Sequence, residues 1–141
     1  IKMSYKIIGQ YIKKLDFRIP NPKSFSLLSK NIANYKINID IKSNQLKETM
    51  IEIETSLSLK PIKEDSDKIE TKIVYSAIIE LADNIREKSK IEKIVLVDVP
   101  TDIYPNLRKI FIFVFENSGF KDIKINDKVD FQKLYHSKKN Q

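Results

Sequence analysis

Apolar and polar residues alternate with period two in four segments of the first 81 residues. These segments are residues 5–19, 35–42, 50–59 and 68–81. Such alternation is typical of strands that bury one face and leave the other to solvent. Strands of this kind usually pair antiparallel, so we predict a four-stranded antiparallel sheet with one solvated face. The polar stretch 60–68 is predicted to be a hairpin loop between the last two strands.

Odd-numbered positions form the predicted inward face of every strand. In the first strand they are Tyr5, Ile7, Tyr11, Leu15, Phe17 and Ile19, with Lys6, Gln10, Lys14, Asp16 and Arg18 opposite. In the other strands they are Tyr35, Ile37, Ile39, Ile41, Ile51, Ile53, Thr55, Leu57, Leu59, Ile69, Thr71, Ile73, Tyr75, Ala77, Ile79 and Leu81. Gly9 interrupts the first strand, and a glycine there indicates a β-bulge or a close backbone approach.

The apolar spacing becomes helical after residue 82. Residues 83–97 predict a short helix that ends before Pro100, because a proline disfavours helical geometry in the residue before it. Residues 98–120 predict a second helix, capped at Thr101 or Asp102, with Pro105 in its first turn and Gly119 at its end.

Within this second helix, the apolar run 110–115 would also suit a buried strand, but the capping residues favour a helix. A third helix is predicted near the C-terminus, capped by Asp127 or Asp130. Four strands followed by two to three helices predict an α+β fold, with the helices on one face of the sheet, as a single domain over residues 1–141.

Composition excludes several kinds of chemistry. The 141 residues include no cysteine, one histidine and two glycines, which excludes disulfides, thiolate zinc sites and glycine-rich phosphate loops. The histidine, His136, lies in a polar C-terminal stretch, and no nucleophile with a neighbouring base is recognisable. We therefore predict a cytoplasmic protein that is not an enzyme and has no catalytic residue, metal or cofactor.

The formal net charge is +7. A solvated, lysine-rich surface explains this charge, and a basic nucleic-acid-binding domain is the alternative. The aromatic residues of the strands fall on the inward faces, where they are more simply explained as core.

The second helix carries more apolar surface than one packed stripe requires. Its other face must be covered by a partner subunit or by an extended apolar ligand. Arg108 lies inside this apolar helix, where it would form either a local ion pair or carbonyl contact, or an ion pair across an interface.

Four stretches, in order along the chain, resemble the SecB family of bacterial protein-export chaperones. They are "YIKKLDFRIPNP" (11–22), "YSAIIEL" (75–81), "VPTDIYPNLRKI" (99–110) and "SGFKDIKINDKVDFQKLY" (118–135). The resemblance implies a homotetramer, a dimer of dimers with helices between sheets. It also implies binding of unfolded polypeptides in apolar grooves without ATP. No apolar run approaches the roughly 20 residues that a membrane span needs, so we expect no insertion into the membrane.

By this resemblance, client-binding residues are expected on the inward strand positions and the last helix. The expected residues are Ile37, Ile39, Ile41, Ile53, Leu57, Tyr75, Ile79, Leu134 and Tyr135. The subunit interface is expected at Ile103, Tyr104, Leu107, Arg108, Phe111 and Phe115.

The family docks SecA on carboxylates of the first and fourth strands. The corresponding positions here are Lys14, Arg18, Glu70 and Lys72. The mostly reversed charge opposes a basic partner and argues against transfer of clients to SecA. Members of the family that protect an antitoxin beside a toxin–antitoxin module need the grooves but not the acidic patch. The predicted client is therefore an unfolded preprotein or, alternatively, an antitoxin.

Overall fold

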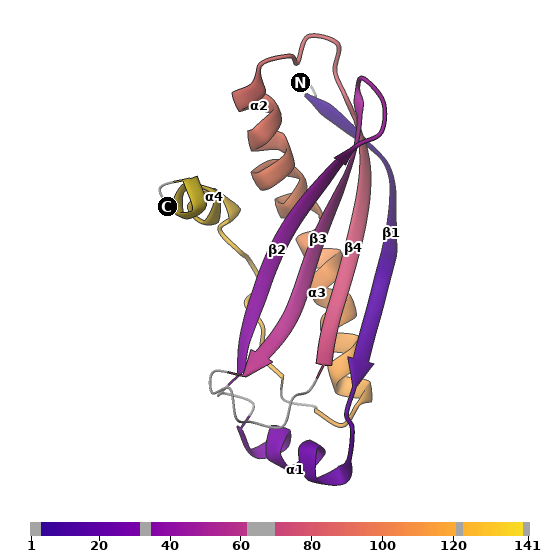
Figure 1. The fold of residues 1–141 in the computed structure, drawn as a ribbon, viewed down its shortest axis with the longest axis vertical. Coiled ribbons are helices and arrows are strands. Elements are labelled where there is room, and N and C mark those ends of the chain that lie inside the picture. Colours follow the sequence, from indigo (N-terminus) through magenta and orange to yellow (C-terminus); the bar gives the residue numbers. More distant parts are fainter. Residues whose placement is uncertain (1–3, 32–34, 62–69, 121–122, 140–141) are drawn as a thin grey trace.

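The computed structural model describes residues 4–31, 35–61, 70–120 and 123–139. Its strands are β1 (Tyr5–Arg18), β2 (Tyr35–Gln45), β3 (Met50–Pro61) and β4 (Glu70–Leu81). Its helices are α1 (Pro22–Asn31), α2 (Lys88–Lys93), the π-helix η2 (Ile94–Asp98), α3 (Val99–Asn117) and α4 (Phe131–Lys139). The strands form one antiparallel sheet in the order β1-β4-β3-β2, and α2 and α3 lie on one of its faces (Figure 1). The predicted α+β fold is confirmed, whereas the predicted hairpin loop and Ile69 lie mostly outside the described residues.

Helix α1 was not predicted from the sequence. It crosses the end of the sheet, because β1 and β2 lie at opposite edges and the chain must pass from one to the other (Figure 1). Asn21 caps it by accepting a hydrogen bond from the Ser24 amide at 2.8 Å. The side chain of Leu28 is fully buried, and the Phe25 ring packs 5.1 Å from that of Phe120.

Strand β1 contains two β-bulges, between Ile7 and Gly9 and between Ile12 and Lys14. The first shifts the side-chain alternation by one residue and the second restores it. The prediction from Gly9 is confirmed, but the predicted faces of Gln10 and Tyr11 are wrong. Gln10 lies on the helix-covered face and Tyr11 on the opposite face, which we call the open face.

Residues 88–117 form one continuous helical segment, so the predicted break before Pro100 is wrong. Pro100 has no N–H group, so it cannot donate a backbone hydrogen bond to a carbonyl in the preceding helical turn. The π-helix η2 comes immediately before α3, and the Val99 N–H bonds to the Ile94 carbonyl five residues earlier. Pro105 consequently lies inside α3 rather than in its first turn. The predicted end is correct, since Gly119 follows the helix with a φ of 96°.

Candidate functional site

Apolar side chains that are partly buried, and one that is exposed, lie along the β2 edge of the sheet, on α4 and on the segment that leads into it. We define this apolar strip as Ile37, Ile39, Ile41, Val129, Leu134 and Tyr135. Four of these residues pack around the buried cluster of Val97, Tyr104 and Phe131. The strip thus lies where the helical layer ends and the edge strand begins, and Leu134 is 38% exposed.

Hydrogen bonds hold the C-terminal side of the strip against the long helical segment. The Tyr104 hydroxyl donates to the Asn126 carbonyl at 2.7 Å, and burial raises the pKa of Tyr104, which keeps it a donor. Arg108 donates from Nε to the Ile125 carbonyl at 3.3 Å, and its Nη2 lies 2.8 Å from Asp127 Oδ1. Arg108 therefore braces residues 125–127 of its own chain, which is the local alternative predicted for it.

Two hydrogen bonds hold helix α4, one at its start and one in its middle turn. Its cap is Asp130, which accepts a hydrogen bond from the Lys133 amide at 3.0 Å. The Tyr135 hydroxyl donates to Glu92 of α2 at 2.8 Å. Of the two predicted caps, Asp130 is thus the correct one, and Asp127 serves Arg108 instead.

The backbone of β2 adds polar groups to the strip. The Leu46 amide donates to the Met50 carbonyl at 2.9 Å, and Ser56 Oγ donates to the Asp40 carbonyl at 3.4 Å. Even-numbered residues of β2 therefore direct their backbone groups toward β3. Because these directions alternate along a strand, Ile37, Ile39 and Ile41 direct theirs toward the outer edge. In the described part of the chain, β2 pairs with β3 alone.

Four of the residues predicted to bind clients belong instead to the core. Ile53, Leu57 and Ile79 are fully buried, and Tyr75 is 9% exposed, on the central strands beneath the helices. A ligand cannot reach them in this structure. The remaining predicted residues, five in number, all belong to the apolar strip.

The predicted interface residues need a similar correction. Ile103, Leu107, Phe111 and Phe115 are fully buried and Tyr104 nearly so, in the chain's own core. Helical periodicity finds such a stripe but does not say whether a sheet or a subunit covers it. The outward side of α3 carries Phe113, which is 65% exposed. Its apolar neighbours Ile110 and Ile112 are partly buried and pack against the core, and Val114 is also partly buried.

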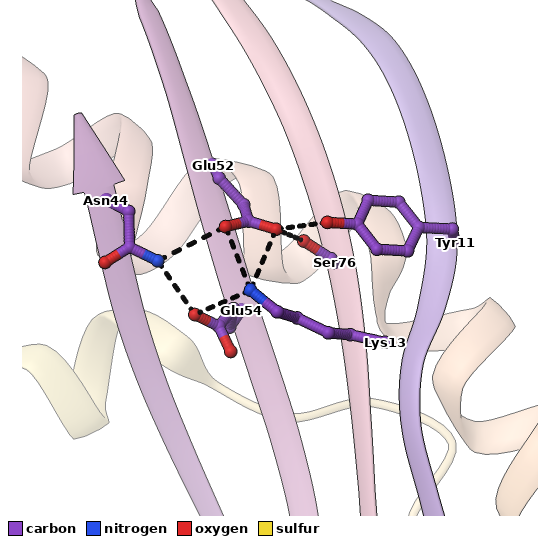
Figure 2. A network of polar contacts seen from close by, with 6 residues as sticks. All are labelled: Tyr11, Lys13, Asn44, Glu52, Glu54 and Ser76. Carbon is purple, nitrogen blue, oxygen red and sulfur yellow. Dashed lines mark hydrogen bonds and ion pairs between the residues drawn. The ribbon is translucent and has the colours of Figure 1, made fainter. Parts of the chain in front are cut away.

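A polar hub that was not predicted lies on the open face, centred on Glu52 (Figure 2). The Glu52 carboxylate accepts hydrogen bonds from the Tyr11 hydroxyl, Ser76 Oγ at 2.7 Å, Lys13 Nζ at 3.1 Å and Asn44 Nδ2 at 3.2 Å. These residues come from all four strands. Only the bulges of β1 bring Tyr11 and Lys13 to this face, so strict alternation gave no signal for the hub.

The hub keeps Glu52 ionised. The hydrogen bonds from Tyr11 and Ser76 outweigh burial and lower the pKa of Glu52 to about 2. The residue is only 7% exposed although it lies on the solvated face. An ionised carboxylate on β3 with donors from the other three strands joins the edge strands to the centre of the sheet.

The predicted SecA-docking positions lie close together on the open face where β1 and β4 pair. Lys14 is opposite Val74, Asp16 is opposite Lys72, and Arg18 is opposite Glu70. Lys14 Nζ also lies 3.3 Å from Asp16 Oδ2. The docking role of these positions stays a prediction.

The described part of the chain offers little to other functions. Its histidine and carboxylate residues form no group of three or more placed to hold a metal ion. Among the described helices, none has the length and apolarity needed to cross a membrane.

A family described as preprotein translocase subunit SecB matches residues 2–141. The chain belongs to the SecB family. A SecB-named protein of Pelagibacter ubique is 36% identical over 137 residues, which cover 97% of this chain and 98% of that protein. Protein-export protein SecB of Gluconacetobacter diazotrophicus is 30% identical over 147 residues, which cover 98% of this chain and 85% of that protein. The predicted family is thereby confirmed, and with it the role of a chaperone in protein export.

A solved structure supports the fold of this SecB-family chain. It is the Mycobacterium tuberculosis Rv1957 SecB-like chaperone in complex with a peptide from the HigA1 antitoxin, with a TM-score of 0.61. The match covers 87% of this chain and 90% of that one, at 10% sequence identity. Because the sequence identity is so low, the similarity between the two structures shows a shared fold alone.

Proposed function

We propose that the protein is an ATP-independent holdase of the cytoplasm that binds extended, non-native polypeptides along the apolar strip. The observation that carries this proposal is an apolar edge strand, β2, whose Ile39 and Ile41 pack around the same small cluster as Tyr135 of α4. An extended client could bury apolar side chains on the strip, at about 25 cal/mol per Å². It could also pair its backbone with β2, a common mode of peptide recognition.

Suppression of aggregation tests this proposal. A stoichiometric amount of the protein should keep a chemically unfolded substrate from aggregating after dilution, as followed by light scattering. Replacing Ile37 and Leu134 with serine should weaken this effect, because both lie on the strip. Leu46→Ser is the matched control, since Leu46 is 48% exposed but lies beyond the end of β2. Equal suppression of aggregation by the wild type, by the variant with both Ile37→Ser and Leu134→Ser, and by Leu46→Ser would contradict the proposed site.

We further propose that the protein acts as a homo-oligomer, with a tetramer as the expected form. The outward side of α3 supports this, because Phe113 is 65% exposed beside partly buried apolar residues. Phe113→Lys should lower the molar mass measured by light scattering, whereas Leu46→Lys should not. An unchanged mass for Phe113→Lys would place the interface elsewhere.

The natural client is proposed to be an unfolded preprotein, with an antitoxin as the second candidate. Lys14, Arg18 and Lys72 on the open face favour the second, because they would repel a basic docking partner. Titration with purified SecA separates the two proposals. Measurable binding supports transfer for export, and its absence at low salt supports a role that does not require SecA.

A further inference from the structure

Four lysines flank the apolar strip along the chain. Lys128 and Lys133 are the sequence neighbours of the strip residues Val129 and Leu134. Lys36 and Lys42 belong to the edge strand β2 and lie on its open face, where they would flank a client strand paired with β2. All four are exposed. The ion pairs found among the described residues involve none of them. Their charges are therefore available to a ligand that lies on the strip.

Carboxylates near the strip already have partners. Asp127 pairs with Arg108, and Asp130 accepts the Lys133 amide at the start of α4. Glu92 accepts the Tyr135 hydroxyl, and Asp40 is half-buried and also engaged. Asp127 is thus neutralised by Arg108, and Asp130 and Glu92 keep their charge but are already hydrogen-bonded, whereas none of the four lysines forms an ion pair within the described part of the chain.

We propose that the strip selects extended segments whose apolar centre is flanked by Asp or Glu. This inference rests on the proposed holdase function and names the class of client for the same site. The apolar centre would lie against Ile39, Ile41 and Leu134. The acidic flanks would approach Lys128 and Lys133 beside the strip, or Lys36 and Lys42 along the edge of β2. Exposed charges attract within a Debye length, about 8 Å at physiological salt, so the preference acts at the ends of the bound segment. Attraction at the rim also increases the rate of association.

Three fluorescent peptides test the preference with the full-length protein. They share one apolar centre and differ only in flanks of two Glu, two Ser or two Lys residues at each end. Anisotropy at 50 mM salt should give tighter binding of the Glu peptide, by roughly two- to five-fold per flanking charge relative to Ser. This difference should nearly disappear at 500 mM salt, where the Debye length falls to about 4 Å.

Variants then locate the charges responsible. Lys128→Glu with Lys133→Glu should remove or invert the preference. The matched control, Lys14→Glu with Lys72→Glu, reverses two charges on the open face and should leave it unchanged. Binding of all three peptides with equal affinity at low salt would overturn the inference while leaving the holdase function intact. Binding of no peptide, together with no suppression of aggregation, would instead overturn the proposed function.

Discussion

Replacing Glu52 with glutamine should destabilise the protein in a pH-dependent way. The substitution preserves the shape of the side chain but removes the charge that accepts hydrogen bonds from the other three strands. A pKa lowered from 4.5 to about 2 corresponds to about 3 kcal/mol at 1.36 kcal/mol per pKa unit. Because the hub lies at the surface of the sheet, solvent screening reduces the expected loss to about 1–2 kcal/mol.

The sign of the pH dependence follows from the lowered pKa. The carboxylate stabilises the folded state fully above the unfolded pKa of Glu52, near 4.5, and this contribution is lost as the pH falls toward 2. The wild-type protein and Glu52→Gln should therefore differ most in free energy of unfolding at pH 7. Their difference should shrink steadily between pH 5 and pH 2.

Urea denaturation at a fixed protein concentration measures this difference, since oligomerisation makes stability depend on concentration. Glu54→Gln is the control, because Glu54 lies on the same strand and face but has fewer polar contacts among the described residues, with Lys13 at 3.5 Å and Asn44 at 2.9 Å. Glu54→Gln should lower the free energy of unfolding by less than Glu52→Gln does. Equal stability of wild type and Glu52→Gln at pH 7, or a deficit unchanged at pH 2, would refute the role assigned to the hub.

Other substitutions test the packing of the helices. Gly119→Ala should lower the free energy of unfolding by about 1–3 kcal/mol, because φ is 96° and an added Cβ would lie 2.9 Å from the Phe25 ring; an unchanged melting temperature would contradict this. Asp130→Ala should cost about 0.5–2 kcal/mol and reduce the helical circular dichroism signal, whereas an unchanged signal would show that the cap is dispensable. Arg108→Met should speed amide hydrogen exchange in residues 123–130, and unchanged protection there would show that Arg108 is not their brace.

Periodicity predicted the sheet well because its strands follow the simplest pattern. In β2, β3 and β4 the register is continuous, so each odd-numbered residue stays on the helix-covered face. In β1 the same rule failed between the bulges. Gly9 indicated one bulge, but no glycine or proline marks the second, beside Lys13. The Glu52 hub depends on both bulges and therefore could not be predicted.

The helices show a different limit of local signals. Pro100 was expected to end a helix, yet the π-helix before it allows the chain to continue. The cap at Asp130 and the end at Gly119 were predicted correctly, because each depends on a few neighbouring residues. Helix α1 also has a local signal, a capping Asn21 followed by Pro22 at the first helical position, although the helix was not predicted.

The accessible part of the site depends on which strands the helices cover. Ile39 and Leu57 lie directly opposite each other on β2 and β3, on the same face and with the same apolar character. Leu57 is fully buried beneath the helical layer, whereas Ile39 is only partly buried at the edge. Alternation treats them alike, because it assigns a face but not a position within the sheet. The strand order β1-β4-β3-β2, which places β2 at an edge, is what separates a core residue from one that a client can reach.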